Sequence, residues 1–117
     1  MKIKMAHFEV NDKKYPLVFN LNVMEEIQEQ YGSLDKWGQM TENVDGASIK
    51  DLKFGVMAMI NEGIDIENEE NGTNEPMINS KQAGRLLSEV GIKEVFEKIH
   101  EITIASTESE DNTGKNE

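Results

Sequence analysis

The sequence predicts an α+β fold, in which an N-terminal β-hairpin packs on a small bundle of four to five helices. Apolar residues alternate with other residues early in the chain, recur at helical spacing later, and are separated by capping residues and glycines. We place a single domain in residues 1–104 and a disordered acidic tail in residues 105–117. Within the domain we expect, in order, a hairpin at 2–20, helices at 22–62, an acidic loop at 63–79 and a helical pair at 80–104.

Charge and cysteine content exclude several classes of function. The chain has 117 residues, with 12 basic and 23 acidic side chains and a net charge of −11. This charge opposes binding to nucleic acid and to anionic membranes. The absence of cysteine excludes disulfides and zinc–thiolate sites. No apolar run approaches the roughly 20 residues that span a bilayer, so we expect a cytosolic protein.

The hairpin is predicted from a period of two. Tyr15, Leu17 and Phe19 occupy every second position, as in a strand with one buried face. Asn11-Asp12-Lys13 supplies the turn. Because Pro16 has no N–H to donate, its nitrogen should face the edge of the sheet.

The first helix is expected to follow the hairpin directly. Asn22 is a good N-cap residue, and Glu25 would complete a capping box with it. An apolar stripe follows, and Gly32 is expected to end the helix. The stripe consists of Val23, Ile27 and Tyr31.

A short second helix should begin after Ser33 and carry Trp37, whose indole is the largest apolar side chain present. Ser48 then caps a third helix that ends at Asn61-Glu62-Gly63. This third helix is apolar almost all round, which is typical either of a central core helix or of one that presents a second face to a partner. We predict partner contacts at Trp37, Phe54, Met57 and Met59, with core packing as the alternative.

The second half of the chain begins with an acidic stretch. Residues 61–76 carry six acids and no base, which predicts a solvated, mobile loop. Ser80 should cap the next helix, and Gly91 should separate it from the last one. Beyond about Ala105 the chain has no apolar residue, which predicts disorder.

Residue patterns of catalysis and metal binding are missing from the sequence. The two histidines, His7 and His100, lie far apart and lack ligand spacing. No nucleophile, phosphate-binding or dinucleotide-binding motif occurs. We therefore predict a protein that is not an enzyme and binds no metal or cofactor.

One stretch carries a family resemblance. Residues 15–37, YPLVFNLNVMEEIQEQYGSLDKW, resemble the N-terminal part of tail assembly chaperones of long-tailed phages and prophages of Gram-positive bacteria. Those proteins show a hairpin followed by a pattern of the type L-x-F-x-x-N-x-x-x-E-[LI]-x-E-x-[YF]-G-[ST]. The matching positions are Leu17, Phe19, Asn22, Glu26, Ile27, Glu29, Tyr31, Gly32 and Ser33.

The resemblance implies a non-enzymatic role in virion morphogenesis. Such chaperones bind the long, aggregation-prone tape-measure protein, keep it soluble and help to recruit the tail-tube protein. They act in the cytoplasm of the bacterial host and leave before the tail is complete, so the mature virion should lack this chain. Whether it forms a homo-oligomer is left open.

Two other interpretations stay open. The chain would instead be an acidic phage-encoded inhibitor that mimics DNA if its acids lay in rows on ordered helices. It would be a small structural tail component if it stayed in the virion. The acids of the predicted loop and tail favour the chaperone over the DNA mimic.

Overall fold

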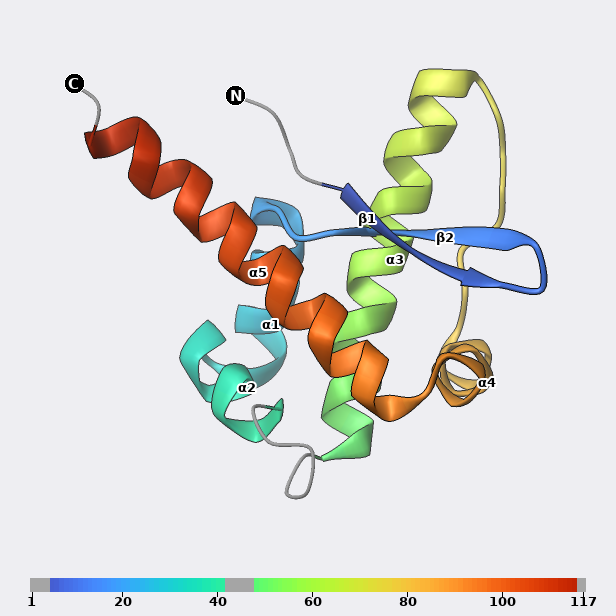
Figure 1. Cartoon of the computed structure of the whole chain (residues 1–117), viewed down its shortest axis with the longest axis horizontal. Coiled ribbons are helices and arrows are strands. Elements are labelled where there is room, and N and C mark those ends of the chain that lie inside the picture. The colour runs from blue at the N-terminus through green and yellow to red at the C-terminus, as the bar shows by residue number, and fades with distance from the viewer. Residues whose placement is uncertain (1–4, 42–47, 116–117) are drawn as a thin grey trace.

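The computed structural model describes residues 5–41 and 48–115, with side chains up to residue 103. It has the predicted α+β fold, with a two-stranded antiparallel sheet and five helices in the described part (Figure 1). The elements are β1 (Met5–Val10), β2 (Lys13–Val18), α1 (Leu21–Tyr31), α2 (Leu34–Thr41), α3 (Ile49–Asn71), α4 (Ser80–Val90) and α5 (Ile92–Lys115).

The hairpin closes through a two-residue turn. Asn11 and Asp12 have φ values of 52° and 67°, the left-handed pair that a type I′ turn requires. Val10 therefore pairs with Lys13, and this pair next to the turn is hydrogen-bonded. Bonded and non-bonded pairs alternate along the ladder, so Pro16 and His7 face each other in a pair without hydrogen bonds between the strands. The missing N–H of Pro16 consequently removes no bond between the strands. Residues 2–4 of the predicted hairpin lie outside the described residues.

Helices cover the hairpin. α3 packs against β2, and α4 and α5 contact β1. The close approach of α3 depends on Gly63, where a Cβ would lie 2.8 Å from Cβ of Pro16. α3 is the central element: it contacts β2, α1, α2 and α4 (Figure 1).

α3 is longer than predicted, and the predicted loop at 63–79 is wrong over its first half. The helix continues through Gly63 and ends at Gly72, which has a left-handed φ of 66°. The local sequence Asn61-Glu62-Gly63 resembles a helix end. In the structure this glycine allows Pro16 to pack closely against the helix. Acids between Glu62 and Glu70 thus lie on a helix rather than in a loop.

The remaining connection, residues 73–79, is held in place by two asparagines of α3. We call this segment the linker. The Asn61 amide donates to the Ile78 carbonyl at 3.1 Å and accepts from the Ile78 N–H at 2.8 Å. The Asn68 amide does the same with Glu75, at 3.0 Å for both bonds. The two asparagines are seven residues apart and so lie on one side of the helix.

Two predicted N-caps are wrong, although the helices they belong to exist. Asn20 caps α1 by accepting from the Val23 N–H. Asn22 instead donates to Glu62 on α3, at 2.9 Å. Asn79, not Ser80, caps α4, in a capping box with Gln82.

Other helix boundaries agree with the sequence. Ser48 caps α3 by accepting from the Asp51 N–H. Gly32 and Gly91 follow α1 and α4 with φ values of 93° and 97°.

α5 does not end at residue 104. The structure continues it as a helix to Lys115, and its last turns project past the other elements (Figure 1). The expected disorder of residues 105–117 in solution stays a prediction.

The core joins both strands and all five helices. Trp37 is 4% exposed, which agrees with core packing, the alternative to a partner contact at this residue. Phe8 and Leu17 come from the hairpin, and Val95, Ile99 and Ile102 bring α5 onto the same cluster. Burial of the α5 stripe explains why this helix packs on the domain although its polar sequence continues beyond it.

Candidate partner-binding site

The four predicted contact residues divide into two pairs. Trp37 and Met59 are 4% and 0% exposed, so they lie in the core. Phe54 and Met57 are partly exposed on α3. The side chains of Phe54 and Met57 are therefore accessible in part, whereas those of Trp37 and Met59 are almost fully covered.

Trp37 is fixed by α3. Its indole lies against Gly55, where a Cβ would come within 2.7 Å of the ring atom Cε2. Its Nε1 donates to the Asp51 carbonyl oxygen at 3.0 Å. The Trp37 carbonyl in turn accepts from the buried Thr41 hydroxyl at 2.9 Å. The contacts with Gly55 and Asp51 hold α2 against α3, while the Thr41 bond lies within α2.

Asp51 joins three helices at this point. Its carboxylate accepts from the Tyr31 hydroxyl of α1 at 2.7 Å, while its backbone carbonyl receives the Trp37 indole of α2. The hydrogen bond from Tyr31 is the main reason that the pKa of the Asp51 carboxyl lies below its ordinary value. The hydrogen bond with Ser48 lowers this pKa further. Burial, reinforced by the Asp51 carboxylate, raises the pKa of Tyr31. The pair therefore favours a neutral tyrosine and an ionised aspartate.

Phe54 makes an aromatic contact within the chain. Its ring meets that of Tyr31 edge-on, with centroids 5.7 Å apart and planes at 79°. Part of the Phe54 surface is thus used in packing α3 on α1. Phe54 and Met57 stay predicted contact residues, with less free apolar surface than their sequence suggests.

A larger apolar surface is an open groove between α2 and α5, with a volume of about 800 Å³. We call it the α2/α5 groove. Its apolar lining comes from three elements or their flanks: Phe19, Leu34, Trp37, Phe96 and Ile99. Asp35, Glu97 and His100 are polar residues that also line it. Lysine and arginine are not among its described lining residues, so its charge is negative.

Each wall of the groove follows from helical spacing. Leu34 and Trp37 are three residues apart on α2, and Phe96 and Ile99 are three apart on α5. Sequence reasoning finds the helical spacing within each of these two segments. It could not foresee that they face each other across an open space, because nothing local pairs a helix near residue 37 with one near residue 99.

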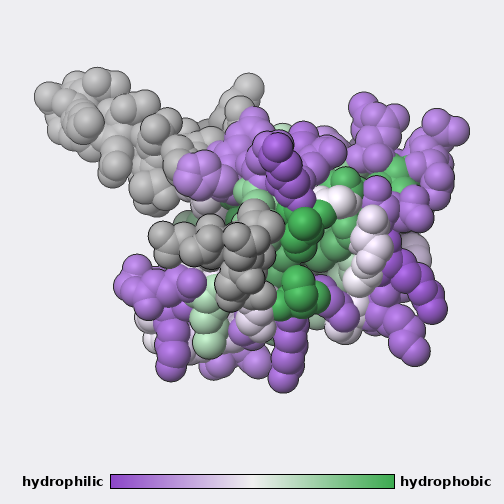
Figure 2. All heavy atoms as spheres, turned by 60° about the horizontal axis from the view of Figure 1, so that its bottom comes forward, coloured by the Kyte–Doolittle hydropathy of each residue, from purple (hydrophilic) through white to green (hydrophobic). Residues whose placement is uncertain are grey.

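A second exposed apolar region lies where α3 begins and α4 meets α5. Ile49 and Ile92 are 55% and 38% exposed. With Leu52 and Leu87 they border a smaller pocket of about 180 Å³. Figure 2 turns the molecule so that the bottom of Figure 1 comes towards the viewer. On this face, hydrophobic side chains lie near the middle and hydrophilic ones surround them.

Charged groups are mostly isolated from one another. In residues 5–41 and 48–103, the one pair of oppositely ionisable side chains within 4.0 Å is His7 and Glu67, at 3.6 Å. No group of three or more histidines and carboxylates in the described part is placed to hold a metal ion. None of the helices there is long and apolar enough to cross a membrane.

Comparison with known proteins identified no similar protein. No protein family, curated protein or solved structure was found to match the chain.

Proposed function

We propose that the chain is a non-enzymatic tail assembly chaperone that binds a tape-measure protein and keeps it soluble in the cytoplasm of the bacterial host. The observation that carries this proposal is the α2/α5 groove, an open apolar surface on a small acidic domain. The resemblance of residues 15–37 to such chaperones points the same way. The tail-tube protein is proposed as a second partner.

The groove fits one recognition mode well. An amphipathic helix can lay an apolar stripe into a groove formed by helices, and residues at three- and four-residue spacing then become its anchors. Asp35 and Glu97 at the groove would pair with lysine or arginine beside that stripe. We therefore propose that the client segment is an amphipathic helix with basic flanks.

Gly38 offers a way to block the groove without removing a core contact. It lines the groove, and a Cβ built there meets no atom within 4 Å. The variant Gly38→Phe should fill the space and leave the fold intact. Gln39→Phe is the matched control, because it adds the same ring to the next, exposed position of α2 outside the groove lining.

The test is co-expression with the tape-measure protein encoded in the same phage or prophage. We expect the chain to increase the soluble fraction of that protein, the Gly38→Phe variant to lose most of this effect, and the Gln39→Phe variant to retain it. Equal aggregation with and without the chain would overturn the chaperone proposal. An effect that survives Gly38→Phe would remove the groove from it.

The proposed chaperone leaves before the tail is complete. Mass spectrometry of purified virions should therefore find no copy of this chain, while the tail-tube protein is abundant. Its presence at a fixed ratio to the tube protein would favour the alternative, a small structural tail component.

One observation favours a second candidate, an acidic inhibitor that mimics DNA. Glu62, Asp65 and Glu69 recur at three- and four-residue spacing on α3, so they form a row on an ordered helix. Such a mimic would inhibit DNA cleavage by a host restriction endonuclease, and neutralising Asp65 and Glu69 to the amides would relieve the inhibition. Neutralising Glu25 and Glu26 of α1 is the control. No inhibition at any ratio would remove this candidate.

A further inference from the structure

The outer edge of β1 is open, with backbone groups that lack hydrogen-bond partners. Because Val10 pairs with Lys13 next to the turn, the ladder bonds fall on Ala6, Phe8 and Val10. The N–H and C=O groups of Met5, His7 and Glu9 point away from β2. Among the described residues no other backbone or side-chain group bonds to them.

The position of Pro16 supports this assignment independently. Pro16 is opposite His7, and proline is tolerated within a sheet where its nitrogen is not needed for the ladder. The pair His7–Pro16 is therefore one without ladder bonds, and the backbone groups of His7 face outward. β1 lies on the near side of the hairpin in Figure 1, and no other described element crosses in front of it.

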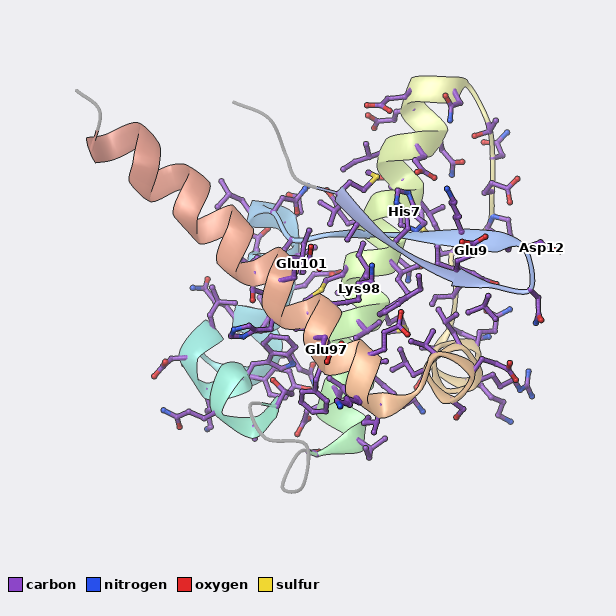
Figure 3. The ribbon with its side chains drawn as sticks, in the orientation of Figure 1. His7, Glu9, Asp12, Glu97, Lys98 and Glu101 are labelled. Carbon is purple, nitrogen blue, oxygen red and sulfur yellow. The ribbon has the colours of Figure 1, made fainter. Side chains whose placement is uncertain are left out.

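Charged residues of both signs lie near this edge, on a chain whose net charge is −11. Figure 3 shows His7, Glu9 and Asp12 along β1 and its turn, and Lys98 and Glu101 on α5. At the end of β1, Val10 lines one pocket together with Lys13 and Arg85. On β2, Lys14 lies across from Glu9 and offsets that one charge. Glu67 of α3, next to His7, adds another acid.

From these observations we propose that the outer edge of β1 binds an extended, basic segment of a partner protein as an added strand. Alternating free N–H and C=O groups at the spacing of a strand are satisfied by another extended backbone. The net charge of −11 then favours lysine or arginine on that segment. It disfavours a second copy of this chain, because both copies would be strongly negative.

This surface is separate from the α2/α5 groove, and the proposal does not depend on the chaperone function. The groove takes the side chains of a helix, whereas the β1 edge takes the backbone of a strand. The two surfaces are distinguished by the protein amides that a ligand protects, because only a ligand at the β1 edge bonds to the backbone of Met5, His7 and Glu9.

The experiment uses the full chain and a short synthetic peptide that alternates lysine with valine or threonine. The control peptide has the same sequence with N-methyl groups on the residues whose N–H would face β1. We expect slow hydrogen exchange at Met5, His7 and Glu9 only when the unmodified peptide is present. The amides of Ala6, Phe8 and Val10 should be protected in both states.

Two variants of the protein sharpen the test. His7→Pro removes one outward N–H without touching a ladder bond, and it should weaken peptide binding by about tenfold or more. His7→Ala loses the same contact with Glu67 but keeps the N–H, so it should bind nearly as well as the wild type. Circular dichroism would check that both variants fold.

Several outcomes would overturn the proposal. One is equal binding of the N-methylated peptide, and another is binding without protection of the outward amides, which would indicate diffuse attraction to acidic side chains. Concentration-dependent protection of these amides without peptide would assign the edge to a second copy of the chain. If His7→Pro did not fold, the comparison of the two peptides would still decide the question.

Discussion

At Gly55 the absence of a side chain is what allows α2 and α3 to touch. The Trp37 indole occupies the space that a Cβ would fill. We expect Gly55→Ala to lower the free energy of unfolding by about 1–3 kcal/mol, the usual cost of overpacking a core. Urea unfolding followed by tryptophan fluorescence would measure this, since the chain has one tryptophan.

Gly38→Ala is the matched control for this substitution. Gly38 also lies in a helix, but a Cβ there meets nothing within 4 Å. Alanine should therefore stabilise the chain by about 0.5–1 kcal/mol through helix propensity alone. If both substitutions changed stability in the same direction, the packing of Trp37 on Gly55 would be wrong.

Asp51 gives the fold a predictable dependence on acid. Its folded pKa lies below the ordinary value of 3.8, chiefly because Tyr31 donates to it. The stabilisation is therefore fully present above pH about 4, and it is lost as the pH falls through the folded pKa. Tyr31→Phe should raise the pKa of Asp51 towards its ordinary value and flatten the loss of stability in acid.

NMR titration of the Asp51 carboxyl carbon in the wild type and in Tyr31→Phe would check this directly. At high pH, the stability that depends on Tyr31 changes in the opposite direction and falls as the pH rises. Since the pKa of Tyr31 is raised in the folded chain, its contribution is present below pH about 10 and is lost as the pH rises through the folded value. An unchanged Asp51 titration in the variant would contradict the hydrogen bond.

Among the elements, the linker depends on the two asparagines of α3. Each bond that Asn61 and Asn68 make to linker backbone contributes roughly 1 kcal/mol. We expect Asn61→Ala or Asn68→Ala to increase hydrogen exchange at Ile78 or Glu75, respectively, by about tenfold or more. Glu70→Ala, an exposed change on the same helix, should leave both rates unchanged.

The errors of sequence reasoning at this scale have two causes. Asn61 and Gly63 look like a helix end because local preference cannot register that Ile78 and Pro16 will arrive beside them. The predicted caps at Asn22 and Ser80 were one or two residues too late. Asn22 instead bonds to Glu62, which is a tertiary contact, whereas the capping box of Asn79 with Gln82 is local and could have been found from the sequence. Periods of two and of 3.6 did predict the strands of the hairpin and the helices, because burial itself produces those periods. Residue types predicted the turn at Asn11-Asp12 and the cap at Ser48.

The candidate site was less predictable than the fold. A buried and a surface-exposed apolar residue give the same signal in a helix that is apolar all round. Met59 proved to be core and Met57 partly exposed, although both lie on α3. The α2/α5 groove and the β1 edge arise only from tertiary arrangement, so no local pattern could have indicated them.

For the molecule as a whole, charge repulsion should limit stability. The net charge is −11. In residues 5–41 and 48–103, His7 and Glu67 are the one pair of oppositely ionisable side chains within 4.0 Å. The acids near the end of α3 also face the negative pole of the helix dipole, without a basic residue in its last turn. Added salt screens such repulsion.

We therefore expect the thermal unfolding midpoint to rise between about 10 mM and about 0.5 M sodium chloride, where the Debye length falls severalfold. Replacing Glu69 and Glu70 by glutamine should raise the midpoint at low salt and reduce the salt dependence. Calorimetry at several salt concentrations would measure both. A midpoint that falls with salt would mean that attractive pairs dominate instead.

The contact between Pro16 and Gly63 also governs when the protein can begin to fold during synthesis. A lone two-stranded hairpin is marginal in water, and the helix that covers β2 lies more than forty residues later in the chain, at Gly63. The nascent chain therefore leaves the ribosome with its hairpin uncovered until α3 has followed. During that interval the strand edges of the hairpin are exposed to other chains, so we expect slower translation through residues 19–63 to increase aggregation.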